Sequence, residues 1–349
     1  MSRCLNISVF CLSLLAFLIA SCAPVEMKVS DWQDESLPET VWPDPPETPR
    51  IKLLRTIATE RDLSGQEENG FLEWLIGDRG SEDSLVSPYG ITADGSGKVW
   101  VADPGAGQVL VFDLARQEIK PLDPPPGLFF QSPVGVSYDP NNRRLYVSDS
   151  ITGSVHIYQD SGVYVGILSP GNMIKRPAGM AVDQLSNLYV VDVLRGVVEV
   201  FSTTGKHVRS IGSKASKNGL FNRPSNVWVD QSGNIYIVDS LRFRVEIQSR
   251  NGELSGVLGG VGNAAGDFAR PRGVAVDSQG HIYVSDAAFD NVQIFDMAGR
   301  LLLFFGSAGE GPGDMCLPAG LFIDSNDRIY VTEGCNQRFQ VFQYRSHAE

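Results

Sequence analysis

Short apolar runs rich in β-branched and aromatic residues alternate with glycine-containing turns over most of the chain. Residues 273–277 (GVAVD) and 282–286 (IYVSD) flank one such turn, and this arrangement predicts a β-hairpin. Further runs at 292–295 and 301–305 supply a third and a fourth strand. Because the four runs follow one another closely, they predict one four-stranded antiparallel sheet.

The same pattern occurs six times between residues 88 and 344. Each repeat begins with Pro-x-Gly or a close variant, and the intervals between the prolines are 45, 44, 47, 47 and 47 residues. An aspartate follows four residues after the glycine, then an aromatic residue, and an acidic residue lies three positions beyond the aromatic one. Six such repeats predict an all-β fold, a six-bladed β-propeller of four-stranded antiparallel blades. The prolines are Pro88, Pro133, Pro177, Pro224, Pro271 and Pro318, and the second acids are Asp103, Asp149, Asp192, Asp239, Asp286 and Glu333.

The last repeat ends after its third strand, at residues 339–342. Upstream of the first repeat, residues 50–57 (RIKLLRTI) have the pattern of the missing fourth strand. We therefore expect this N-terminal strand to complete the last blade, so that the propeller spans residues 50–349. Closure of the ring removes the sheet edges that would otherwise invite aggregation.

Five of the six repeats carry a glycine two positions after the proline. We expect this glycine to adopt a positive φ, because glycine does so without a steric penalty. In repeat four Asn226 takes its place, and asparagine also tolerates this conformation.

These repeats resemble the NHL repeat, whose blades have the form Pro-x-Gly-ϕ-ϕ-ϕ-Asp, then ϕ-Tyr-Val-ϕ-Asp and Val-x-ϕ-Phe, where ϕ is apolar. The resemblance spans about residues 88–344. The Asn and Arg that the family carries after the second acid are present in 333–338 (EGCNQR) but absent from 103–105 (DPG). NHL propellers include peptide amidating lyase, a metal enzyme with several histidine ligands, and related propellers include calcium-dependent gluconolactonase-like enzymes.

The first 21 residues predict a secretory signal peptide, because Arg3 precedes an apolar stretch, 9–20, that is too short to span a bilayer. Residues 18–22 (LIASC) resemble the lipobox of bacterial lipoproteins. The resemblance implies that Cys22 is lipidated after cleavage and anchors the protein to a membrane; the alternative is an ordinary cleaved signal. By the sorting rule of Gram-negative lipoproteins, Ala23 implies the outer membrane, facing the periplasm or the cell surface.

Two further segments precede the repeats. Residues 22–49 are rich in proline and acidic residues, which predicts an extended, lipid-anchored linker. Residues 58–84 form an insertion in which 71–76 (FLEWLI) has the spacing of a short amphipathic helix. This helix either lies across one face of the propeller or binds a partner.

The charge and the cysteines narrow the partners and the compartment. The formal net charge is −12, and residues 26–84 hold 15 acidic against 6 basic side chains, which argues against nucleic acid as a partner. Of five cysteines, Cys4 and Cys11 leave with the signal and Cys22 carries lipid. We expect Cys316 and Cys335 to form a disulfide, because both lie at the same end of neighbouring strands in a compartment that permits it.

Catalytic chemistry has little support in the sequence. The six second acids form a ring that either binds a cation at the axis or accepts backbone N–H groups, and their presence in every blade favours the structural role. Four histidines form no ligand set, and there is no haem motif, nucleophile elbow or phosphate loop. We therefore expect no catalytic residue, metal or cofactor. The alternative is a metal-dependent enzyme of lyase or lactonase type acting at the axial pocket.

Basic residues in the loops of repeats three to five break the repeat symmetry. These loops precede the first strand or follow the second, so they open on one face of the propeller. They are either ordinary repeat residues or a basic crescent for an acidic partner. The favoured function is a non-catalytic binding or scaffold lipoprotein of the cell envelope that presents this face to a protein. The candidate binding residues are Arg176, Arg195, Arg223, Arg242, Arg244, Arg270 and Arg272.

Overall fold

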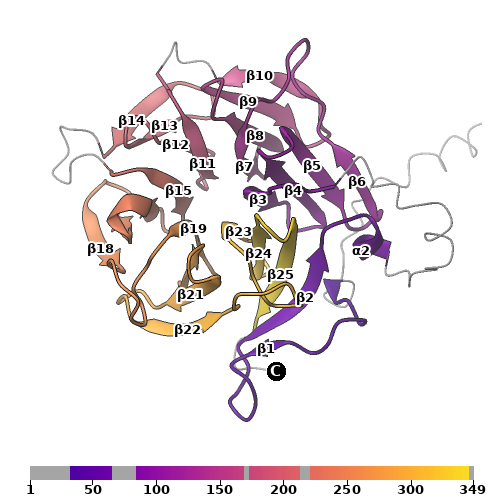
Figure 1. Ribbon diagram of the computed structural model, residues 1–349. Helices are drawn as coiled ribbons and strands as arrows, with labels where there is room; N and C mark the ends of the chain where they lie inside the picture. The colour runs from indigo at the N-terminus through magenta and orange to yellow at the C-terminus, as the bar shows by residue number, and fades with distance from the viewer. Residues whose placement is uncertain (1–31, 65–83, 169–172, 213–220, 346–349) are drawn as a thin grey trace, which may run out of the picture.

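The structure is a computed structural model that describes residues 32–64, 84–168, 173–212 and 221–345. Its strands form six antiparallel sheets arranged as a ring around one axis (Figure 1). Five sheets have four strands and the sixth has five. The predicted all-β six-bladed propeller is therefore confirmed. Cys22 and the helix expected at 71–76 lie outside the described residues.

In blades 1 to 5 the strands run from innermost to outermost in chain order, whereas in blade 6 the N-terminal strands β2 and β1 form the outer edge. Blades 1 to 3 consist of β3 (Gly90–Ala93), β4 (Lys98–Asp103), β5 (Gln108–Asp113) and β6 (Glu118–Pro121); β7 (Pro133–Asp139), β8 (Arg144–Asp149), β9 (Ser154–Gln159) and β10 (Tyr164–Leu168); and β11 (Pro177–Val182), β12 (Leu188–Asp192), β13 (Val197–Phe201) and β14 (His207–Ile211). Blades 4 and 5 consist of β15 (Pro224–Val229), β16 (Ile235–Asp239), β17 (Arg244–Gln248) and β18 (Leu254–Leu258); and β19 (Pro271–Val276), β20 (Ile282–Asp286), β21 (Asn291–Phe295) and β22 (Leu301–Phe305). Blade 6 consists of β23 (Pro318–Ile323), β24 (Arg328–Glu333), β25 (Arg338–Tyr344), β2 (Ile51–Ile57) and β1 (Val41–Trp42).

The N-terminal strand closes the ring as predicted. β2 pairs antiparallel with β25, so that Ile51 lies opposite Tyr344 and Ile57 opposite Phe339. The chain then continues into the short helix α2 (Arg61–Ser64). Among the described residues, no helix is both long enough and apolar enough to cross a membrane.

Residues 32–49 pack on the propeller, although the sequence led us to expect an extended linker there. β1 pairs with β2, and the fully buried Trp32 contacts Tyr330 with 6.0 Å between ring centroids. Trp42 packs against Phe305 and Phe342, at 5.8 and 5.7 Å. Burial of these large aromatic side chains stabilises the packed state. The expectation of an extended linker is therefore wrong for residues 32–49.

Apolar side chains fill the space between neighbouring blades. Trp100 of blade 1 stacks on Tyr138 of blade 2 at 5.0 Å, and Phe112 of blade 1 meets Phe339 of blade 6 at the same distance. Each blade therefore depends on both neighbours for its core, and a break in the ring exposes apolar surface on two sides.

The repeat glycine permits the innermost strands to approach one another. A Cβ on Gly135 would lie 2.2 Å from the carbonyl oxygen of Ala178 in the next blade, and one on Gly320 would lie 2.1 Å from that of Tyr89. The expected positive φ is wrong, because none of these glycines, nor Asn226, has one. The five are Gly90, Gly135, Gly179, Gly273 and Gly320.

The second acid of each repeat organises the loops around it, as the structural interpretation predicts. The carboxylate of Asp103 accepts hydrogen bonds from the backbone N–H groups of Val86 and Ser87, at 2.6 and 2.9 Å, and of Gly105 at 3.0 Å. Asp149 and Asp286 make the same kinds of contact in blades 2 and 5. These acids are thus used to join the loop before the first strand to the loop after the second.

The predicted disulfide is confirmed. Cys316 and Cys335 are bonded, with their Cα atoms 5.6 Å apart. The bridge links the loop before β23 to the loop after β24 in blade 6. It therefore fastens the same two loops that Glu333 joins by accepting the Cys316 N–H at 3.2 Å.

Candidate binding site at the mouth of the axial channel

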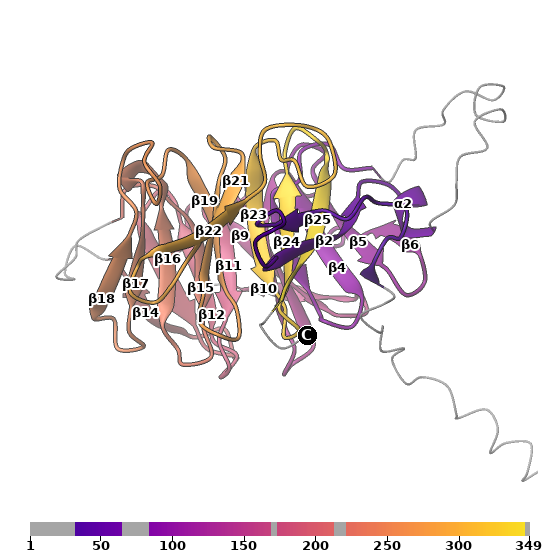
Figure 2. The ribbon, with the colours of Figure 1, turned by 90° about the horizontal axis from the view of Figure 1, so that it is seen from below.

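The innermost strands all begin on one face of the ring, and the second strands end there. Pro224 lies opposite Asp239, and Pro271 lies opposite Asp286. We call this the proline face, and Figure 2 shows the ring edge-on. Because the candidate arginines flank these strand ends, all seven belong to the proline face.

A cavity of about 300 Å³ opens where the axial channel meets the proline face. Of the seven candidate arginines, Arg176, Arg223, Arg270 and Arg272 line it. Within the described part of the chain, none of these four guanidinium groups forms an ion pair, and Arg272 lies over the Tyr89 ring at 5.4 Å. The cavity is therefore lined on the side of blades 3 to 5 by positive charge that no carboxylate of the described residues neutralises. We call these four residues the mouth arginines.

The other three candidates are held by buried acids. Arg195 contacts Glu199 and donates a hydrogen bond to the Met173 carbonyl oxygen at 2.7 Å. Arg242 lies 3.4 Å from Asp239, and Arg244 contacts Glu246. The seven arginines are thus not one uniform crescent, since the structure divides them into four at the mouth and three in ion pairs.

Exposed aliphatic side chains lie on the same face, in blades 2 to 4 beside the mouth arginines, and sequence reasoning missed them. Ile151, Leu194 and Leu241 are 65%, 68% and 50% exposed, in the loops after the second strands of blades 2 to 4. The order around the ring is fixed by contacts: the Phe221 N–H donates to the Gly196 carbonyl oxygen, and the Ser240 hydroxyl donates to that of Pro271. The sequence did contain a sign of this difference between blades. The three aliphatic residues lie two positions after the repeat acid, where the other blades have Gly105, Ala288 and Cys335.

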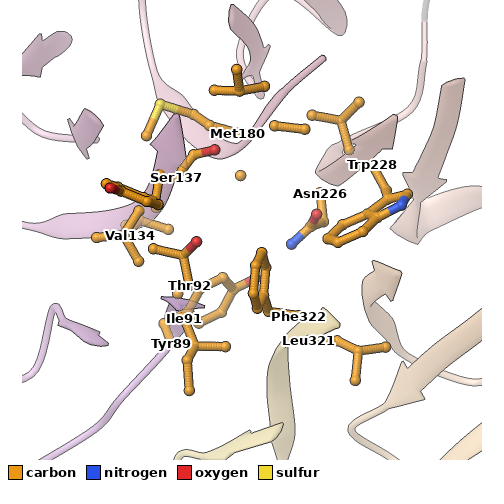
Figure 3. Close-up of a pocket in the computed structure, with 18 of the residues that line it drawn as sticks. Tyr89, Ile91, Thr92, Val134, Ser137, Met180, Asn226, Trp228, Leu321 and Phe322 are labelled. Carbon is orange, nitrogen blue, oxygen red and sulfur yellow. The ribbon is translucent and has the colours of Figure 1, made fainter. Parts of the chain in front are cut away.

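A second cavity of about 70 Å³ lies deeper in the channel, between the innermost strands (Figure 3). Tyr89 and Val134 line both cavities, so this axial chamber continues the mouth. Trp228 and Phe322 also line the chamber and pack against each other, with 5.6 Å between ring centroids.

The lining of the chamber is mainly apolar, with a small set of neutral hydrogen-bonding groups. Figure 3 shows the hydroxyls of Thr92 and Ser137 and the amide of Asn226 directed toward its centre. Among the described residues, no aspartate, glutamate or histidine lines either the chamber or the mouth. Across residues 32–64, 84–168, 173–212 and 221–345, no three His, Cys, Asp or Glu side chains gather as metal ligands. The groups at the axis therefore suit an anionic ligand better than a cation.

Comparison with known proteins supports the fold and the repeat. The family model of the NHL repeat matches residues 268–295 and 315–342, which belong to blades 5 and 6. No curated protein matches the chain.

Solved structures with a similar fold differ in function. A protein of unknown function from Bacteroides thetaiotaomicron is 17% identical, with a TM-score of 0.60 over 77% of this chain and 72% of that one. An auxiliary nutrient binding protein from the same organism is 13% identical, with a TM-score of 0.60 over 75% and 70%. Inactive virginiamycin B lyase from Staphylococcus aureus with quinupristin is 13% identical, with a TM-score of 0.56 over 76% and 97%. Identities this low show a shared fold only.

Proposed function

We propose that this protein is a non-catalytic binding protein of the bacterial cell envelope that holds an acidic segment of a protein partner at the mouth of its axial channel. The observation that carries the proposal is the convergence of the four mouth arginines on one cavity without a carboxylate partner among the described residues. The surrounding protein is acidic, with a formal net charge of −12. A positive mouth on an acidic body steers an acidic segment to this one place.

The aliphatic side chains beside the mouth arginines support a protein ligand. Ile151, Leu194 and Leu241 give the proline face exposed apolar area next to positive charge. An acidic peptide segment that also carries apolar side chains would contact both. Exposed apolar side chains grouped in this way are typical of protein interaction surfaces.

The metal-dependent lyase or lactonase alternative gains no support from the site. Such an enzyme ordinarily holds its cation with carboxylate or imidazole ligands. The two axial cavities offer guanidinium groups, hydroxyls and one side-chain amide instead.

Reversal of the charge at the mouth tests the proposed function. In a triple variant with Arg176→Glu, Arg223→Glu and Arg270→Glu, we expect the affinity for a short oligoglutamate peptide to fall at least about tenfold. Affinity of the unaltered protein should also fall as sodium chloride is raised, because these side chains are exposed to screening. Isothermal titration calorimetry measures both effects.

A matched control carries the same change in net charge on the opposite face. Arg116, Lys206 and Arg250 are exposed in turns between third and fourth strands, so their replacement by glutamate leaves the mouth intact. Equal losses of affinity in the two triple variants would show that only overall charge matters, and the proposal would fail.

The proposed location rests on the lipobox-like sequence that ends at Cys22. Attachment of several acyl chains to one residue gives a stable membrane anchor. With Cys22→Ser, we expect the protein to leave the membrane fraction or to accumulate as an unprocessed precursor. Fractionation of cells and intact-mass analysis measure this, and unchanged retention with normal processing would contradict lipidation.

A further inference from the structure

We infer that the axial chamber is a binding site for one carboxylate group of the partner, which Thr92, Ser137 and Asn226 bind below the mouth arginines. This inference rests on the proposed function and assigns a separate role to the inner end of the channel. The mouth arginines attract the acidic segment, and the neutral donors bind its tip.

Asn226 departs from the pattern of the other five blades. The repeat glycine elsewhere lets neighbouring innermost strands approach, as at Gly273, where an added Cβ would lie 2.6 Å from the Ala319 carbonyl oxygen. In blade 4 the contact with blade 5 is made differently: the hydroxyl of Ser225 donates to the Arg272 carbonyl oxygen at 2.8 Å. Asn226 is therefore free to extend its amide into the chamber, where it forms no hydrogen bond with any described residue. A departure from the repeat that adds a polar group to an apolar channel points to a ligand.

Thr92 provides an independent observation on the opposite side of the chamber. Its side chain is only 1% exposed, and its hydroxyl oxygen is buried without a hydrogen-bond partner among the described residues. Ser137, from the next blade, is 6% exposed and lines the same chamber. A buried hydroxyl without a partner destabilises the fold, whereas valine has the same shape and avoids this cost. The hydroxyl is explained if a ligand accepts its hydrogen bond.

The chemistry of the lining selects a carboxylate. The amide of Asn226 can donate two hydrogen bonds and each hydroxyl can donate one, while no acidic side chain of the described residues lines the chamber. A cation there would be repelled by the mouth arginines. A buried water needs about 10–15 Å³ of such space, so about 70 Å³ admits a carboxylate-sized group with little else. The remainder of the ligand must lie in the larger mouth.

Two sources of this carboxylate fit a narrow channel: an Asp or Glu side chain and the free C-terminus of the partner. Both place the group on a thin stem that can pass the arginines. An anionic membrane also carries negative charge, but its surface is broad, whereas the chamber lies inside the ring and is reached through the mouth. Binding to a membrane surface would therefore contradict the inference.

Three conservative variants of the full-length protein test the chamber. Asn226→Gly restores the residue of the other five blades, and Thr92→Val and Ser137→Ala remove hydroxyls with little change of shape. We expect each to melt at or above the temperature of the unaltered protein, and to bind the oligoglutamate peptide about tenfold more weakly. Sodium acetate should displace the peptide from the unaltered protein better than sodium chloride does at the same ionic strength, and this difference should vanish in Asn226→Gly.

The outcomes separate this inference from the proposed function. If the mouth variants lose affinity while Asn226→Gly and Thr92→Val bind normally, the chamber inference is wrong and the proposed function stands. If the mouth variants bind normally, the proposed function fails as well. Amidation of the peptide C-terminus weakens binding if the terminus is the source, and leaves binding nearly unchanged if a glutamate side chain is. If the unaltered protein binds vesicles of anionic lipid as tightly as it binds the oligoglutamate peptide, the inference is wrong.

Discussion

Blades 4 and 6 carry charged and polar side chains at equivalent positions. In blade 6 these side chains form hydrogen bonds with one another, whereas in blade 4 several of their atoms have no partner among the described residues. In blade 6, Arg338 donates to Glu333 at 3.0 Å and to the carbonyl oxygens of Glu310 and Gly311 at 2.7 and 2.9 Å. Gln340 donates to both Glu333 and the Asp314 carbonyl oxygen. The buried acid, its arginine and the preceding loop thus form one connected network.

Blade 4 replaces this network with one that carries an additional buried charge. Asp239 and Arg244 stand where blade 6 has Glu333 and Arg338, and Glu246 stands where it has Gln340. Although Arg244 contacts Glu246, one carboxylate oxygen of each acid and the Nε of Arg244 have no partner among the described residues. Burial raises the pKa of Asp239, and likewise raises that of Glu333 in blade 6, because the charged form is removed from water.

The contrast separates a stabilising role from a binding role. Blade 6 joins the two ends of the chain, and its disulfide and satisfied network hold that junction. Blade 4 supplies Arg223 to the mouth and Asn226 to the chamber, and its polar groups are less completely paired. Asn226, which departs from the repeat pattern, and the unpaired polar atoms of blade 4 thus lie in the blade that contributes to the proposed site, as expected when function offsets stability.

The largest expected effect follows removal of the strand that closes blade 6. A variant that begins at Glu60 lacks β1, β2 and the buried Trp32, so it leaves an exposed edge on β25 and a gap between blades. We expect insoluble protein or complete loss of cooperative unfolding, measured by soluble yield and circular dichroism. A control that begins at Asp31 keeps all these contacts and should melt as the full chain does. Similar melting of the two would show that β2 does not stabilise the ring.

Loss of the blade 6 arginine should cost more than loss of its counterpart in blade 4. Arg338→Ala leaves Glu333 buried without its cation, which typically lowers the free energy of unfolding by about 3–5 kcal/mol. Arg244→Ala should lower it by at most about 1 kcal/mol, because Arg244 is partly exposed and Arg242 remains 3.8 Å from Glu246. Urea unfolding measures both values. Equal losses would mean that the two networks contribute alike, contrary to the comparison.

The disulfide should have a slightly smaller effect than Arg338. Its cysteines are 19 residues apart, and closing a loop of that length stabilises by about 3 kcal/mol through the unfolded chain. The double variant Cys316→Ser and Cys335→Ser should lose this amount in urea unfolding, and reductant should lower the stability of the unaltered protein to the same level. If reductant also lowers the stability of the double variant, the loss of stability has a cause other than reduction of the Cys316–Cys335 bond.

The fold was predictable because its information is local and repeated six times. Runs of apolar residues, turn glycines and the acid after each second strand specify a blade within one repeat. The packing of residues 32–49 was not predictable, because proline and acidic residues dominate that segment and only Trp32 and Trp42 indicate burial. The role of the repeat glycine was also missed, since a sequence shows that a side chain is excluded but not whether φ or a neighbouring strand excludes it.

The placement of the candidate site residues was predictable in part. Register placed the arginines on one face, because the residues before each first strand and after each second strand lie at the same end. It did not show which arginines are neutralised, since that depends on Glu199 and Glu246 lying behind them on third strands. The chamber requires several blades to be placed around one axis, so Thr92 and Asn226 meet only in the folded ring.

The smallest expected effect compares one buried position of the third strand in blades 1 and 2. Blade 2 has His156 where blade 1 has Leu110. His156 is 4% exposed, its Nδ1 has no partner among the described residues, and burial lowers its pKa below the ordinary 6.5. The folded protein therefore resists protonation that the unfolded chain accepts. The resulting stability is present above the unfolded pKa and is lost as the pH falls through it toward the lowered value.

We expect His156→Leu, which restores the residue of blade 1, to remove this pH dependence. Between about pH 7.5 and 5.5, the unaltered protein should lose up to about 1.4 kcal/mol more unfolding free energy than the variant does. Urea unfolding at the two pH values measures the difference. Between about pH 7.5 and 8.5 the two proteins should change in parallel, because His156 is neutral in both states there. If the variant loses as much stability on acidification as the unaltered protein, protonation of His156 in the folded state carries no free-energy cost. The side chain at position 156 would then be more accessible to water than Leu110, its counterpart in blade 1.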